Sequence, residues 1–221
     1  GGNAGPCVEC IIRGLEVATL VFMQYKVVDN EFVKLPIRTV DTGYGIDRYA
    51  WLSQGVPSGF HAIYGDALDK IFQMAGMSKI DEDLLAKVAK FSGLVSLDKM
   101  ASRLDARKKI AELVGMNTNQ LDEFLLPIEN VFAVADHTKC LGFILSEGVV
   151  PSNIQEGYLA RLIFRRIYRM LKMLGIPDRL HDIMDMQINL WSRDYPNLKE
   201  MRNEIMAVSY THLTLPTKRI V

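Results

Sequence analysis

The sequence has no excess of charge of either sign, because its 221 residues include 26 lysines and arginines and 26 aspartates and glutamates. Net charge therefore gives no indication of a nucleic-acid partner, and such a function would have to come from a local cluster of basic side chains. Cysteine is also scarce. Three cysteines without a regular framework are typical of a reducing compartment and argue against a secreted disulfide scaffold.

Long apolar runs are missing as well. Stretches such as Val17 to Met23 are far too short to span a bilayer, and no charged leader precedes an apolar region. We therefore expect no membrane partner and a cytoplasmic location. The hydrophobic content of 49% is sufficient for the core of one large domain or two small ones.

The pattern of the chain changes from strand-like to helical. From Cys7 to Thr42 it is rich in β-branched residues, with Asp29 and Asn30 between two strand candidates, which predicts antiparallel strands and a hairpin. Apolar residues then recur at helical spacing, which predicts helices over 48–54, 64–74, 82–91, 97–114, 121–145 and about 153–174, and a further pair divided by Pro196. The expected fold class is α+β. Predicted helix breaks are Gly93, Gly115 and Gly148, and predicted N-caps are Ser96, Asn117 and Ser152.

The two ends of the chain differ from what a complete natural protein would show. The first residues, Gly1-Gly2-Asn3, include no initiator Met, which indicates a fragment. Residues 208–221 replace the preceding charged, helix-friendly pattern with β-branched residues and a proline, and they are similar to a translated sequencing adaptor. We expect this segment to be a non-native tail. A genuine strand-like tail is the alternative.

The stretch from Val40 to Arg48 joins the strand-like part to the helical part through Gly43 and Gly45. Glycine suits a positive φ or a close approach to a ligand. Asp41 and Arg48 supply opposite charges at this corner, which can bind a zwitterion or a nucleotide. An ordinary tight turn would explain the same pattern.

Blocks of sequence around this corner identify a resemblance. They read GNAGPCVE at 2–9, GLEVATLVFMQY at 14–25, VDTGYGIDRYAWLSQG at 40–55, ADHTKCLGFILSEGVVPSN at 135–153 and GYLARLIFRRIYRMLKMLG at 157–175. In content and order they resemble the alanyl-tRNA synthetases of the archaeal type, which are class II aminoacyl-tRNA synthetases, and residues 40–55 resemble motif 3. The resemblance covers most of residues 1–175.

The resemblance implies a division of the chain into three parts. Residues 1–60 would be the C-terminal part of the class II catalytic domain including motif 3, residues 61–207 a helical tRNA-recognition region, and residues 208–221 the tail. The chain would be a fragment of an alanine–tRNA ligase without motifs 1 and 2 and without the editing domain. Alone it would be inactive, because the motif 2 arginine that binds the α-phosphate of ATP is absent. The alternative is a non-catalytic RNA-binding paralogue, which would need neither Asp41 nor Arg48.

The resemblance also implies roles for residues of the corner. Alanine would be bound by Val21, Asp41 and Gly43. ATP with Mg²⁺ would be bound by Glu16, Gln24, Gly45 and Arg48. In this reading Asp41 pairs with the ammonium group, Val21 limits the size of the side chain, and Arg48 binds ATP. Glu16 could equally be a solvated strand-edge carboxylate. One departure is Asp47, where the family usually has Glu before the motif 3 arginine.

The helix expected over residues 153–174 is rich in basic side chains, namely Arg161, Arg165, Arg166, Arg169 and Lys172. Tyr158, Leu162 and Ile163 are expected to pack. On the residues alone a solvated charged face is the favoured interpretation. The resemblance instead implies that Arg161, Arg165 and Arg166 contact the acceptor stem of tRNA(Ala), and that Asn153 reads a G·U wobble pair through its minor-groove edge.

Two cysteine-containing pairs have side chains of the kind that bind zinc. Cys7 with Cys10 and His137 with Cys140 could supply four ligands, but the second pair lies inside a predicted continuous helix. We therefore expect no zinc in this chain. No nucleophile elbow is present, which argues against a Ser/His/Asp hydrolase.

Overall fold

The structure is a computed structural model that describes residues 2–77, 80–94 and 103–214. The chain divides into two compact units. The first contains the residues up to 63 together with 82–115, and the second contains 64–81 together with 116–221.

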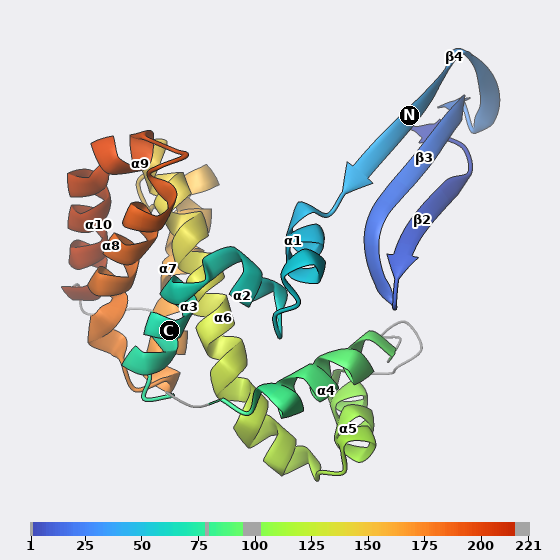
Figure 1. Ribbon diagram of the computed structural model, residues 1–221. Helices are drawn as coiled ribbons and strands as arrows, with labels where there is room; N and C mark the ends of the chain where they lie inside the picture. The colour runs from blue at the N-terminus through green and yellow to red at the C-terminus, as the bar shows by residue number, and fades with distance from the viewer. Residues whose placement is uncertain (1, 78–79, 95–102, 215–221) are drawn as a thin grey trace. The chain divides into compact units, whose positions relative to one another are not determined.

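The first unit contains an antiparallel sheet centred on one long strand (Figure 1). Strand β3 (Leu15–Val28) pairs with β4 (Glu31–Tyr44) along one edge. Its other edge pairs with β1 (Asn3–Ala4) and β2 (Cys7–Ile12) in succession. Gly5 separates these two strands and lies so close to β3 that a Cβ atom there would fall 1.7 Å from the Phe22 carbonyl oxygen. Only glycine fits at this approach.

The hairpin predicted at Asp29 and Asn30 is confirmed. These two residues connect β3 to β4, with φ values of 48° and 67°. A two-residue connection with both φ values positive matches the right-handed twist of the flanking strands, and Asp and Asn tolerate that conformation better than most residues.

The helices of the first unit follow the sheet. They are α1 (Ile46–Gln54), α2 (Gly59–Tyr64), whose last residue belongs to the second unit, α4 (Glu82–Leu94) and α5 (Arg103–Val114). The break predicted at Gly93 is confirmed to within one residue, because α4 ends at Leu94. Gly115 follows α5 with a φ of 77°. The predicted cap Ser96 and the start of the helix expected at residue 97 lie outside the described residues.

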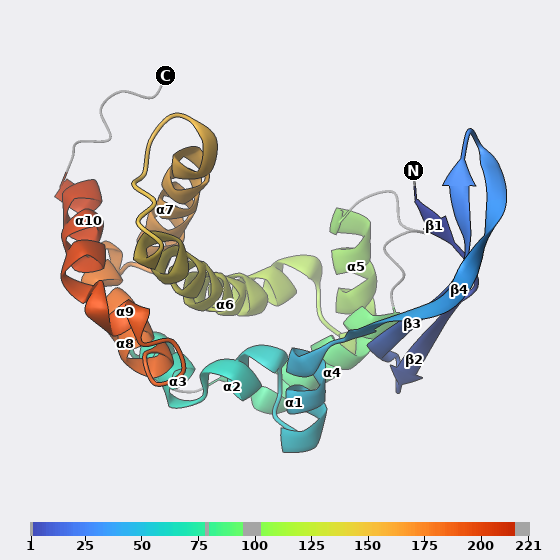
Figure 2. The ribbon, with the colours of Figure 1, turned by 90° about the horizontal axis from the view of Figure 1, so that it is seen from above.

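The second unit is helical. It contains α3 (Asp66–Met74), α6 (Thr118–Ser146), α7 (Gln155–Met173), the 3-10 helix η2 (Pro177–Arg179), α8 (Leu180–Trp191), α9 (Asn197–Glu200) and α10 (Arg202–Thr214). Helix α6 packs against α3, α7, α8, α9 and α10, and Figure 2 shows α7 and α8 beside it from above. Its fully buried side chains, such as Leu121, Ile128 and Leu141, form the centre of the core.

Two predicted N-caps have different outcomes. Asn117 caps α6 as predicted: its Oδ1 accepts from the main-chain nitrogen of Gln120 (2.9 Å), and the Gln120 side chain accepts from the main-chain nitrogen of Asn117 (3.1 Å). This reciprocal pair satisfies two donors at the helix start. The prediction for Ser152 is wrong, because Ile154 occupies the N-cap position of α7.

The end of the described chain is helical rather than strand-like. Helix α10 crosses the boundary expected at residue 208 and ends at Thr214. Ser209 is fully buried, and its hydroxyl donates to the main-chain oxygen of Met206 (2.8 Å). None of the described helices has both the length and the apolar character needed to cross a membrane.

Candidate functional site

Two residues expected to bind alanine are paired with each other on adjacent strands of the sheet. Val21 on β3 lies directly opposite Asp41 on β4, and Thr19 lies opposite Gly43. Directly opposed residues of antiparallel strands project from the same face, so these four positions share one surface. Asp41 is exposed and Val21 is half-buried. Within the described part of the chain, the Asp41 carboxylate forms no hydrogen bond or ion pair.

This register depends on an irregularity in β4. An unbroken pairing from the Asp29–Asn30 turn would place Arg38 opposite Val21, whereas the register shifts between Met23 and Tyr25 and brings Asp41 there instead. Pro36 lies in the extra segment of β4. Proline has no N–H for the ladder and is tolerated at bulges, which gives a physical reason for the shift.

The two glycines of the corner do not have positive φ values, which excludes the first of the two expected reasons for glycine and leaves a close approach to a ligand. At Gly43 a Cβ atom would meet only the Thr19 carbonyl oxygen, at 4.0 Å, so the protein itself leaves room for a side chain. Gly45 has a φ of −78°, and a Cβ atom there would lie 2.9 Å from Cδ of Arg48. A side chain at position 45 would therefore displace the stem of Arg48, which folds over Gly45.

Main-chain contacts join the end of β4 to β3 and start α1. The Gly45 nitrogen donates to the Val17 carbonyl oxygen (3.0 Å), and the Gly45 carbonyl accepts from the nitrogens of Arg48 and Tyr49 (3.0 Å each). These bonds fix where the first turn of α1 begins relative to β3. They bring the Arg48 side chain to the start of β3.

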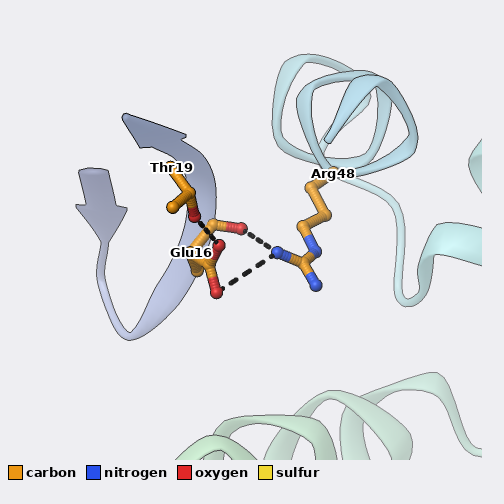
Figure 3. Close-up of polar contacts among 3 residues, drawn as sticks. All are labelled: Glu16, Thr19 and Arg48. Atoms are coloured by element: carbon orange, nitrogen blue, oxygen red, sulfur yellow. Dashed lines mark hydrogen bonds and ion pairs between the residues drawn. The ribbon is translucent and has the colours of Figure 1, made fainter. Parts of the chain in front are cut away.

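Arg48 contacts Glu16 in two ways (Figure 3). Its Nη1 donates to the main-chain oxygen of Glu16 (2.7 Å) and lies 3.8 Å from the carboxylate Oε2. The other carboxylate oxygen of Glu16 accepts a hydrogen bond of 2.5 Å from the Thr19 hydroxyl. The side chains of Arg48 and Glu16 are 46% and 41% exposed, so a ligand can reach both.

No pattern in the sequence indicates this three-residue contact. Regular strand alternation would place Glu16 and Thr19 on opposite faces. The strand is not regular here, because the pairing of β2 with β3 has a bulge between Cys10 and Ile11, and Figure 3 shows β3 bending at Glu16. A bulge increases the local twist and redirects side chains.

Asp47 is not the carboxylate that pairs with Arg48. It is exposed in the first turn of α1, where a negative charge suits the helix dipole. Among the described residues, Glu16 is the acidic partner of Arg48. Arg48 is therefore positioned here by Glu16 and not by Asp47. Gln24 is half-buried and lies at the register shift between Met23 and Tyr25.

The second group of expected site residues lies on α7. One face of this helix is buried through Gly157, Ala160, Ile163, Phe164, Ile167 and Leu171. Arg166, Arg169 and Lys172 are exposed, and Arg161 and Arg165 are half-buried. The packing role predicted for Tyr158 is wrong, because this side chain is 51% exposed. The Nη1 atom of Arg161 donates to Oδ1 of the exposed Asn153, in the segment that precedes α7.

The cysteine pairs considered for zinc lie on separate elements. Cys7 and Cys10 are exposed on β2, while His137 and Cys140 lie within α6. Burial raises the pKa of the Cys140 thiol, and the negative charge of Asp136 raises it further, which disfavours the thiolate that binds metals. Over the described ranges, no group of three or more His, Cys, Asp or Glu side chains could hold a metal ion.

Comparisons with known proteins give one family. A family model described as tRNA synthetases class II (A) matches residues 1–211. The chain is 44% identical over 208 residues to an alanine–tRNA ligase of Methanococcus maripaludis strain C5, and 43% identical over 209 residues to one of Methanothermobacter thermautotrophicus. In each case the match covers 94% of this chain and 23% of the relative. The chain therefore spans less than a quarter of the length of these relatives.

Proposed function

Because the chain belongs to the family of class II (A) tRNA synthetases, we propose that it forms part of the adenylation site and of the tRNA-binding region of an alanine–tRNA ligase. The observation that carries this proposal is the corner of β3, β4 and α1, where an unpaired carboxylate and a half-exposed guanidinium belong to one folded unit. A ligase of this kind activates alanine with ATP and then transfers it to the terminal adenosine of tRNA(Ala).

Alanine would bind on the face of the sheet that carries Val21 and Asp41. The Asp41 carboxylate has no partner among the described residues and is free to accept hydrogen bonds from the substrate ammonium group. Val21, directly opposite, would limit the length of the amino-acid side chain. Gly43 leaves this face without a side chain, so that the substrate can approach the main chain.

ATP would bind at the end of the sheet where Arg48 meets Glu16. The planar guanidinium of Arg48 suits a phosphate or an adenine ring, and Gly45 gives its stem room to reach that position. The Glu16 carboxylate suits Mg²⁺, which is usually held by one or two carboxylates and by substrate phosphates. Bound Mg²⁺ would neutralise phosphate charge. Gln24, at the register shift between β3 and β4, completes the proposed set of ATP-binding residues.

In the first step the alanine carboxylate attacks the α-phosphorus of ATP, and pyrophosphate leaves. A hydroxyl of the terminal adenosine then attacks the carbonyl carbon of the adenylate, and AMP leaves. The contribution of this chain is to orient the substrates: Asp41 fixes the amino group and Arg48 fixes ATP. Because the relatives are much longer, we expect the 221-residue chain alone not to catalyse either step.

The tRNA acceptor stem would bind along α7. Arg165 and Arg166 have no hydrogen bond or ion pair within the described ranges, so their guanidinium groups are available for phosphates. Asn153 would contact a base-pair edge in the minor groove, and Arg161 contacts Asn153. We also propose a cytoplasmic location, where all three free cysteines would remain reduced.

The proposal is tested by replacing the matching segment of the Methanococcus maripaludis ligase with this chain. We expect the hybrid protein to retain alanine-dependent pyrophosphate exchange and aminoacylation. Asp41→Ala in the hybrid should abolish exchange, because the ammonium group loses its charged partner. Glu31→Ala, which removes an exposed carboxylate at the other end of β4, is the matched control and should have no effect. Near-normal exchange by Asp41→Ala would contradict the assignment of Asp41.

The hybrid also separates the ligase from a non-catalytic paralogue. A paralogue would bind tRNA(Ala) but would leave the folded hybrid inactive in pyrophosphate exchange. Exchange activity in the hybrid would exclude that alternative.

A further inference from the structure

The segment before α7 is fixed to the helix at Gly157. The Ser152 nitrogen donates to the Gly157 carbonyl oxygen (2.9 Å). A Cβ atom at Gly157 would lie 2.2 Å from the Ser152 hydroxyl oxygen and 2.6 Å from the Val150 carbonyl oxygen. The segment from Val150 to Ser152 therefore lies directly on the helix surface, which a side chain at position 157 would prevent.

The bonds of Ser152 continue this contact toward Asn153. Its hydroxyl donates to the Ile154 carbonyl oxygen (3.0 Å) and accepts from the Ile154 nitrogen (3.3 Å). The main chain on both sides of Asn153 is thus held in place. Arg161 follows Gly157 by one helical turn, so its side chain is positioned to meet the side chain of Asn153, and its Nη1 donates to Oδ1 there.

This contact determines which way the Asn153 amide points. Rotation of an asparagine amide exchanges an acceptor for a donor, and a free amide at the surface can adopt both orientations. A guanidinium has donors only, so the side of the amide that faces Arg161 must be its oxygen. The amide nitrogen is then directed away from Arg161, and the second lone pair of the oxygen stays available.

We propose that Arg161 is a positioning residue for base-pair recognition: it fixes the orientation of the Asn153 amide that reads the minor-groove edge of the acceptor stem. This inference rests on the proposed function, because it takes Asn153 as a group that contacts RNA. Discrimination between base pairs depends on the pattern of donors and acceptors. An amide with one orientation presents one such pattern, whereas a rotating amide presents two.

A measurement can distinguish two roles of Arg161: positioning of the Asn153 amide and direct contact with a phosphate. A residue that neutralises a phosphate contributes to the salt dependence of binding, and its loss lowers the slope of log K against log salt by about 1 with little effect on sequence preference. A positioning residue has the opposite signature. Its loss reduces sequence preference and leaves the salt slope unchanged.

The experiment uses the 221-residue chain and two RNA minihelices of the tRNA(Ala) acceptor stem, one with a G·U pair and one with G·C at that position. Dissociation constants of both are measured over a range of salt concentrations for the unsubstituted chain, Arg161→Met, Arg161→Lys and Arg166→Met. We expect Arg161→Met to reduce the preference for G·U roughly tenfold, the size expected for one lost specific contact, without changing the salt slope. Arg161→Lys should recover only part of the preference, because a flexible ammonium group holds an amide less firmly.

Arg166→Met is the matched control, since Arg166 is exposed on the same helix and has no contact with Asn153. It should lower the salt slope by about 1 and keep the preference. Thermal melting confirms that each variant is folded. A preference that survives Arg161→Met, or a loss of salt slope in that variant, would overturn the inference. If the unsubstituted chain shows no preference, the proposed role of Asn153 fails, and the inference is overturned with it.

Discussion

Arg48 owes its position to two residues that are distant in the sequence and to one nearby glycine. Thr19 fixes one oxygen of the Glu16 carboxylate, Glu16 receives the guanidinium, and Gly45 makes room for the Arg48 stem. An ion pair that is nearly half exposed contributes at most about 1 kcal/mol to stability. The consequence of this contact is therefore orientation: the guanidinium is held at one place before ATP arrives, which lowers the cost of binding.

This arrangement predicts a role for the Thr19 hydroxyl in the use of ATP. In the hybrid ligase, Thr19→Val keeps the shape of the side chain but removes the donor to Glu16. A hydrogen bond to a charged, partly exposed group is worth about 1 kcal/mol, so we expect KM for ATP to rise roughly fivefold while KM for alanine stays unchanged. Pyrophosphate-exchange kinetics with each substrate varied in turn measure both constants.

Two further variants serve as controls for Thr19→Val. Thr19→Ser retains the hydroxyl and should restore KM for ATP. Thr39→Val changes an exposed threonine on the same sheet and should have no effect. Equal increases in both KM values after Thr19→Val would indicate general damage to the sheet and would contradict a specific role in positioning Arg48.

At the scale of secondary-structure elements, local chemistry determined which features the sequence could predict. The turn at Asp29 and Asn30 and the cap at Asn117 were predicted because each depends on a few neighbouring residues. The helix end near Gly93 is a local feature of the same kind, since glycine disfavours a helix by about 1 kcal/mol relative to alanine and α4 ends at Leu94.

The candidate site was predictable in its residues but not in its register. Asp41 and Arg48 were identified from the corner and from the resemblance. That Val21 faces Asp41 depends on the irregular pairing near Pro36, and that Thr19 supports Glu16 depends on the bulge beside β3. Both irregularities move side chains by one or more positions, and regular alternation cannot anticipate them.

Because the segment before α7 lies directly on the helix at Gly157, we predict that replacing this glycine by alanine lowers the stability of the fold. Gly157→Ala would place a methyl group 2.2 Å from the Ser152 oxygen, so the segment must move. We expect the free energy of unfolding to fall by about 1 to 3 kcal/mol, as for overpacking elsewhere. Urea denaturation followed by circular dichroism measures the change.

Gly142→Ala provides the matched control in α6. A Cβ atom there would meet only Leu198 at 3.9 Å and Met184 at 4.0 Å, which are ordinary contacts. Because alanine favours a helix over glycine by roughly 1 kcal/mol, this variant should be neutral or slightly more stable. Equal effects of the two substitutions would show that position 157 is not specially constrained.

At the scale of the whole molecule, residues 82–115 group with the sheet, and residues 64–81 group with the chain from 116 onward. The expected division into regions 1–60, 61–207 and 208–221 stays a prediction. Sequence patterns identify helices one at a time and carry no information on which unit each helix joins. The functional labels of the regions, catalytic and tRNA-binding, remain predictions.

The whole-molecule organisation also bears on the segment from residue 208 onward, which was expected to be a non-native tail. Helix α10 runs through it to Thr214, packs against α8, α6 and α9, and buries Ser209, and the family match extends to residue 211. We predict that a chain ending at residue 207 has a lower melting temperature than one ending at residue 214. The expected decrease is about 2 to 4 °C for each 1 kcal/mol of stability that is lost, as is usual for a domain of this size. Scanning calorimetry of the two truncated chains measures what residues 208–214 contribute. Identical melting temperatures would mean that residues 208–214 of α10 add nothing to the stability of the fold, as expected of a non-native tail.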